Sequence, residues 1–113
     1  MQMTEDEKLV LAYIQVRQGK AKAIPVATLE ALTEIPGARI RAIVRRLIIT
    51  HKYRIGTSLA KPPGFYMIRT QAEADETIAG LLSRIRALRE RMTILAELTL
   101  QEANKQIMME LGK

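Results

Sequence analysis

Two short helical segments separated by a tight turn occupy residues 26–51, and this pattern constrains the fold more than any other feature. VATLEALT (residues 26–33) has apolar residues at helical spacing, with Val26, Leu29 and Leu32 expected to face inward. Pro36-Gly37 then interrupts the helical pattern. A second helix is expected from about Ala38 to about His51. Two helices so close together must pack against each other at an angle.

Two β-prone segments follow these helices. Residues 53–55 (YRI) alternate like a half-buried strand, and residues 65–68 (FYMI) are rich in β-formers. The stretch from Gly56 to Gly64 contains Pro62-Pro63 and is expected to be the hairpin loop. Ile24, just before Pro25, is expected to form a short additional strand. The region therefore predicts two helices completed by a β-hairpin.

An amphipathic helix is expected near the N-terminus. Thr4 and Glu7 have the spacing of a capping box, in which each side chain accepts a hydrogen bond from the other residue's backbone. The helix is expected to continue to about Gln18, with Gly19 ending it. Its apolar face is expected to consist mainly of Leu9, Tyr13 and Ile14, with Val10 and Val16 as further candidates.

The helix near residues 38–51 has a core face and a basic face. At 3.6 residues per turn, one broad face collects aliphatic side chains, which are Ile40, Ile43, Val44, Leu47 and Ile48. The opposite face contains Ala38, Ala42, Arg45 and Ile49, and it is flanked by Arg39, Arg41 and Arg46. Residues 39–46 contain no acid, so ion pairs within the helix do not account for these arginines.

Small residues and arginines on one helix face suit a nucleic-acid groove. Alanine allows close approach, and arginine contacts phosphates or donates two hydrogen bonds to guanine. DNA contacts are accordingly expected from Arg39, Arg41, Ala42, Arg45 and Arg46. Arg54 and Lys61, assigned to the hairpin, are expected to contact the DNA backbone. The alternative is a solvated helix face and an ordinary polar loop.

Composition limits the chemistry that this chain performs. The 113 residues include no cysteine and one histidine, and they lack a phosphate-binding glycine loop or a cluster of metal-ligating residues. No enzyme activity, metal or cofactor is therefore expected, and His51 is expected to pack or to cap a helix. The chain shows no secretion signal or membrane span, which predicts a cytoplasmic protein.

The excess of positive charge is confined to the first part of the chain. Residues 1–70 contain 12 Lys and Arg against 5 Asp and Glu, a net charge of +7. Residues 71–113 contain 6 Lys and Arg against 7 Asp and Glu, a net charge of −1. A basic surface on one domain is typical of a module that binds a polyanion.

A long helix is expected from the capping box Thr70–Glu73 to about Leu111. Its apolar residues first follow a heptad pattern and then a shifted register, with a stutter or bend near Thr99. The heptad residues are Ile78, Leu81, Ile85, Leu88, Met92 and Leu95, and the shifted ones are Leu100, Ala103, Ile107 and Leu111. We expect residues 1–69 to form the basic domain and residues 70–113 a dimerisation segment, in which Ile107 and Leu111 join the six heptad residues.

The distribution of charge along this helix favours an antiparallel partner. Arginines dominate residues 84–91, whereas glutamates dominate residues 97–110. A parallel pair would place Arg84 near Arg89 of its partner, which is a contact between like charges. An antiparallel homodimer, or a helical hairpin bent near Thr99, is therefore expected.

With these segments identified, residues 24–68 resemble winged helix-turn-helix domains. The likeness is greatest to small prophage-type DNA-binding proteins of bacteria and to the DNA-binding domain of the biotin repressor. The matching segments are ARIRAIVRRLI (38–48), YRIGTS (53–58) and GFYMI (64–68). The chain departs from the pattern where Pro36-Gly37 replaces the Ser or Thr that often precedes the second helix of the motif.

The resemblance implies a winged helix, and with the heptad pattern the expected fold is mostly α-helical with a small β-hairpin: a winged helix followed by a long C-terminal coiled-coil helix. It also implies binding of double-stranded DNA, usually as a dimer. A sequence-specific transcriptional regulator is the expected function, with no small-molecule ligand evident. The alternative is a phage or plasmid replication or assembly adaptor that uses the same surfaces to bind proteins.

Overall fold

The structure, a computed structural model, describes residues 2–112. The chain divides into two compact units, one ending at Thr77 and the other beginning at Ile78. It is mostly helical, with one two-stranded antiparallel hairpin and a long C-terminal helix, which confirms the predicted fold class at this level. Among the described residues, no helix combines the length and apolar content needed to cross a bilayer.

Helix α1 spans Glu5–Gln15 and starts with the predicted capping box. It ends earlier than predicted, with Val16 as its C-cap, so the expectation that Gly19 ends it was wrong. The reason is tertiary: the Met67 amide donates to the Arg17 carbonyl at 2.7 Å, and the Gly19 amide donates to the Met67 carbonyl at 2.9 Å. Backbone pairing with a distant strand therefore replaces the last helical turn.

The buried face of α1 also differs from the prediction. Val10, Leu11 and Ile14 are buried, whereas Leu9 and Val16 are exposed. Leu11 is buried because α1 contacts both α3 and the hairpin, so its apolar face is wider than one stripe.

Helices α2 (Val26–Thr33) and α3 (Gly37–Ile49) form the predicted pair, and the bounds of α2 are those predicted. Leu29 is buried and Val26 packs against the core, but Leu32 is exposed, contrary to expectation. Four of the five predicted inward residues of α3 are buried, and Ile48 is the exception. Ile48 lies at the edge of the apolar face, where no neighbouring element covers it completely.

Strands β1 (Ile55–Ser58) and β2 (Gly64–Met67) form the hairpin, with Ile55 opposite Met67 and Ser58 opposite Gly64. The hairpin starts later than predicted because the Tyr53 amide still donates to the Leu47 carbonyl of α3, at 2.9 Å. The loop is accordingly shorter than expected and comprises residues 59–63. The expected strand at Ile24 is a single bridge, in which Ile24 and Phe65 exchange backbone hydrogen bonds of 2.8 and 2.9 Å.

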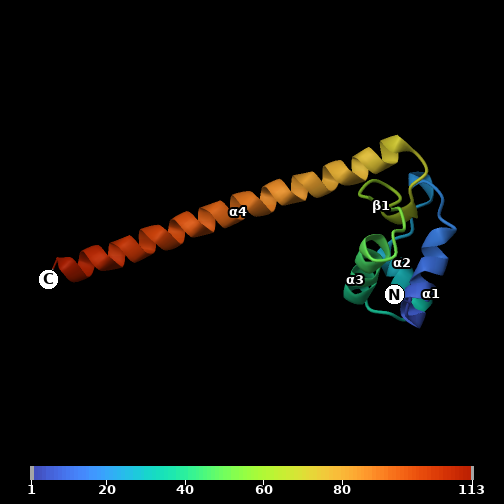
Figure 1. Cartoon of the computed structure of the whole chain (residues 1–113), viewed down its shortest axis with the longest axis horizontal. Coiled ribbons are helices and arrows are strands. Elements are labelled where there is room, and N and C mark those ends of the chain that lie inside the picture. Colours follow the sequence, from blue (N-terminus) through green and yellow to red (C-terminus); the bar gives the residue numbers. More distant parts are fainter. Residues whose placement is uncertain (1, 113) are drawn as a thin grey trace. The chain divides into compact units, whose positions relative to one another are not determined.

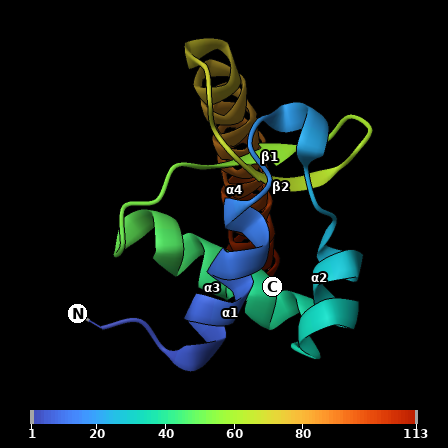
Figure 2. The same ribbon diagram turned by 90° about the vertical axis from the view of Figure 1, so that its right-hand side faces the viewer.

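The core of the N-terminal unit lies where α1, α2, α3 and the hairpin meet (Figure 2). It is aliphatic apart from Phe65 at its boundary, as the low aromatic content requires. Tyr66 is also fully buried, on the other side of the hairpin, where its ring lies against Gly56. The buried aliphatic residues of the cluster are Val10, Leu11, Ile14, Ile24, Leu29, Ile35, Ile40, Ile43, Val44, Leu47 and Ile55.

Helix α4 spans Gln71–Leu111 as one unbroken helix (Figure 1). The bend or hairpin expected near Thr99 is therefore absent; the Thr99 hydroxyl donates to the Leu95 carbonyl at 2.8 Å without interrupting the helix. The predicted capping box is present, and Glu73 also accepts from the Lys20 amide at 2.8 Å. Backbone hydrogen bonds from Lys20, Arg69 and Thr70 lower the pKa of Glu73. The bond from Lys20 ties the first turn of α4 to the rest of the N-terminal unit, which extends to Thr77.

Gly64 provides a test of the close approach between the hairpin and residue 24. Its φ is +121°, and a Cβ there would overlap the Ile24 carbonyl group. We expect Gly64→Ala to lower the free energy of unfolding by more than about 2 kcal/mol, because backbone atoms must shift.

Gly80→Ala is the control: a Cβ at this position in α4 meets nothing within 4 Å. It should be neutral or stabilise by up to about 1 kcal/mol. Thermal unfolding followed by circular dichroism measures the stability of both variants. Equal changes in the two would contradict the close backbone approach at Gly64.

Candidate nucleic-acid interface

The solvent-facing side of α3 combines small residues with two arginines. Ala38, Ala42, Arg45 and Ile49 are all exposed, and Arg41 is exposed on one flank of this face. Within the described part of the chain, the side chains of Arg41 and Arg45 form no hydrogen bond or ion pair. We call these five residues the α3 outer face. The predicted outer face of the helix is therefore exposed to solvent.

The other flank of α3 is neutralised by α1. Both Nε and Nη2 of Arg39 donate to one carboxylate oxygen of Asp6, at 3.1 and 2.7 Å. This pair is partly exposed, so its contribution to stability is small, about 0–1 kcal/mol. It does, however, hold the Arg39 guanidinium beside α1.

Arg46 is bound more firmly to α1, through a buried carboxylate. Its Nε donates to Oε2 of Glu7 at 2.9 Å, and the Glu7 side chain is only 2% exposed. Oε1 of Glu7 accepts from the Thr4 amide at 2.8 Å. The hydrogen bond from Thr4 and the pairing with Arg46 lower the pKa of Glu7 from 4.5 to about 2. We therefore assign Arg46 to the packing of α1 on α3, and not to the α3 outer face.

His51 lies beside the same carboxylate. Its Nε2 is 3.5 Å from Oε2 of Glu7, and its side chain is 8% exposed. This position agrees with the packing role expected for the chain's single histidine. Across residues 2–112, no group of three or more His, Cys, Asp or Glu side chains is arranged to hold a metal ion.

A carboxylate from α2 caps the N-terminus of α3. Pro36, the N-cap residue, has no side-chain donor or acceptor, and the Gly37 amide instead donates to Oε1 of Glu30. Glu30 thus occupies the place of the missing Ser or Thr. Helix N-termini attract phosphate, but a negative side chain here repels it. The central and C-terminal parts of α3 are consequently better suited to DNA.

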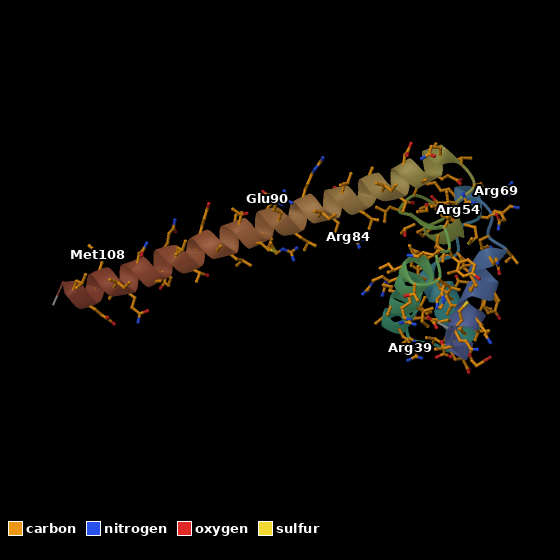
Figure 3. All side chains as sticks on the ribbon, viewed as in Figure 1. Arg39, Arg54, Arg69, Arg84, Glu90 and Met108 are labelled. Atoms are coloured by element: carbon orange, nitrogen blue, oxygen red, sulfur yellow. The ribbon has the colours of Figure 1, made fainter. Side chains whose placement is uncertain are left out.

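The two basic residues assigned to the hairpin are separated. Arg54 precedes β1, at the open end of the hairpin, where its carbonyl accepts from the Ile68 amide at 2.9 Å. Lys61 is exposed in the loop, at the other end. Figure 3 also shows Arg54 far from Arg39 of α3. Arg54 and Lys61, both assigned to the hairpin, therefore lie at its opposite ends, because β1 begins directly after Arg54.

The predicted dimerisation residues all lie on α4, and all are exposed to solvent. No residue of α4 is buried, and its large apolar side chains are between 46% and 75% exposed. Figure 3 shows side chains projecting from every side of α4, including Arg84, Glu90 and Met108. The predicted residues are Ile78, Leu81, Ile85, Leu88, Met92, Leu95, Ile107 and Leu111.

Sequence patterns did not reveal the acids that oppose α3. Asp6, Glu7 and Glu30 each contact α3, yet only the capping role of Glu7 follows from local spacing. The one available signal was the excess of arginines in α3 over acids in the same helix, which implies partners elsewhere.

Comparison of the chain with protein-family models, with curated protein sequences and with solved structures finds no match.

The buried Glu7 carboxylate predicts a pH-dependent stability. Because folding lowers its pKa to about 2, its stabilisation is complete above pH 4.5 and is lost as the pH falls towards 2. We expect Glu7→Gln to cost about 1–3 kcal/mol at pH 7, since Arg46 loses a buried, charged partner. The variant should also lose less stability than the wild type between pH 4.5 and 2.

Glu5→Gln is the matched control for Glu7→Gln. Glu5 lies in the same helical turn, but its side chain is 92% exposed and, among residues 2–112, pairs only with Lys8, at 3.4 Å. Urea unfolding at several pH values compares the two variants. If Glu7→Gln lost as much unfolding free energy between pH 4.5 and 2 as the wild type, the role assigned to this carboxylate would be contradicted.

Proposed function

We propose that this protein binds double-stranded DNA as a homodimer, with α3 in the major groove and the hairpin as the wing of a winged helix. The observation on which this proposal chiefly depends is the division of the α3 arginines. Arg39 and Arg46 pair with acids of α1, whereas Arg41 and Arg45 remain on the outer face beside two alanines. Core packing and ion pairing account for the first two arginines but not for the second two.

The dimensions of α3 suit a major groove. Its 13 residues extend about 20 Å, and the major groove, about 12 Å wide, admits a helix. Ala38 and Ala42 allow the helix backbone to approach the base edges closely. Arg45 then donates to guanine or phosphate, and Ile49 offers an apolar contact to a thymine methyl group. Recognition by base edges supports a sequence-specific regulator of transcription.

The separation of charge also supports a polyanionic partner. The net charge of +7 belongs to residues 1–70, and residues 71–113 have a net charge of −1. The exposed loop containing Lys61 follows α3 in the element order α2, α3, β1, β2. That order supports a wing that contacts the DNA backbone through Lys61 and positions the protein without specifying bases.

Helix α4 supplies the dimerisation segment of the proposal. Monomers seldom expose contiguous apolar patches larger than a few hundred square ångströms, and the stripe along α4 continues for 34 residues from Ile78 to Leu111. A dimer places two copies of α3 on one DNA molecule. Two-fold related half-sites are then the expected target.

Replacing Arg45 tests the α3 outer face. We expect Arg45→Ala to weaken binding to a selected duplex by about tenfold or more, because a bidentate base contact is worth about 1–3 kcal/mol. Lys8→Ala is the charge-matched control, since Lys8 is exposed on α1 and pairs only with Glu5. Fluorescence anisotropy of labelled DNA measures both affinities.

The salt dependence of binding and the two variants show which results would contradict DNA binding. If about four Lys or Arg side chains of the dimer contact phosphates, affinity should fall about 100-fold between 50 and 200 mM salt. Affinity that stays constant over this range would contradict DNA binding. If Arg45→Ala and Lys8→Ala weakened binding equally, the attraction would be general and α3 would not be the recognition helix.

A further inference from the structure

The apolar stripe of α4 needs a partner that is as long as the helix. From Ile78 to Leu111 the helix extends about 50 Å. A unit of 77 residues has a radius of gyration of only about 11–12 Å, so the N-terminal unit is too small to cover that length. The partner must itself be an elongated apolar surface.

We infer that the partner is α4 of a second copy, aligned antiparallel, with the twofold axis between Leu95 and Ala96. This inference goes beyond the proposed dimer because it specifies direction, register and facing residues. It is based on the size, the chemistry and the charge of the residues along the stripe.

Large and small residues are segregated along the stripe. Up to Leu95 its core positions contain Leu88, Met92 and Leu95. After a shift of four residues they contain Ala96, Thr99 and Ala103, with Leu100, Ile107 and Leu111 to one side. Antiparallel alignment about the stated axis places Leu95 opposite Ala96, Met92 opposite Thr99 and Leu88 opposite Ala103 of the second copy. These central layers each join one large and one small side chain, which permits dense packing, whereas further out Ile85 and Leu81 face Gln106 and Glu110.

A parallel dimer would distribute the same residues unevenly. At the same core positions, leucine and methionine would face themselves in the first half, and threonine and alanine would face themselves in the second half. The Thr99 hydroxyl already donates to the Leu95 carbonyl, at 2.8 Å, so it enters an apolar layer without an unsatisfied hydrogen bond. Thr99 is thus compatible with Met92 as its neighbour.

Residues beside the stripe agree with the same register. Leu82 and Ile107 are both exposed and lie on one edge of the stripe, and antiparallel alignment places them side by side across the interface. On the other edge, Arg91 comes opposite Glu102 of the second copy, and the symmetry repeats this pair. Facing apolar and opposite-charge pairs at these edges stabilise the antiparallel arrangement.

Engineered cysteines test direction and register in the full chain, which has no thiol of its own. Under mild oxidation, we expect Leu88→Cys/Ala103→Cys to form a dimer linked by two disulfides. Within one straight helix these positions are about 22 Å apart, whereas a disulfide requires Cα atoms closer than about 7 Å. An intramolecular disulfide is therefore impossible in an unbroken α4.

Leu88→Cys alone is the matched control. In the antiparallel register the two copies of residue 88 are about 22 Å apart, so this variant should give no disulfide-linked dimer. Efficient linking of Leu88→Cys to itself would overturn the inference in favour of a parallel dimer. Failure of the double variant to link, or sedimentation of the unmodified protein as a monomer, would overturn it as well. None of these measurements uses DNA, so they remain informative if DNA binding itself fails.

Discussion

The buried carboxylate of Glu7 connects the local structure of α1 with the packing of α3. It completes the capping box with Thr4 and accepts a hydrogen bond from Arg46, 39 residues further along the chain. Removing the Arg46 guanidinium would leave the buried carboxylate without its cationic partner, which is more costly than losing an exposed ion pair. The position of α1 on α3 depends on this one group, and the position of α1 decides which side of α3 remains open.

The same arrangement gives the arginines of α3 different roles. Asp6 and Glu7 draw Arg39 and Arg46 to one flank, and Glu30 from α2 places negative charge at the N-terminus. Within α3, the positive charge that is available to a partner is therefore concentrated at Arg41 and Arg45. A helix that is basic all round would attract DNA in many orientations. Neutralising one flank and one end favours a single orientation, which is the requirement for recognising a sequence.

Local patterns predicted the elements of this fold, but tertiary contacts decided where several of them end. The bounds of α2 and both capping boxes followed from spacing, because they depend on residues within one helical turn. The end of α1 and the start of β1 did not, because pairing with Met67 and Leu47 determines them. For the candidate site, the exposed face of α3 was predictable from its periodicity. The partners of Arg39 and Arg46 were not, since Asp6 and Glu7 lie 33 and 39 residues away in the sequence and become neighbours only after folding.

NMR titration of the full chain with a short duplex measures whether the α3 outer face contacts DNA. If it does, amide chemical-shift changes should concentrate at residues 41–49 and in the loop at residues 59–63. Shifts on α1 should be small around Lys8, which lies outside the proposed interface. Shifts confined to α4, or no shifts at low salt, would contradict the account.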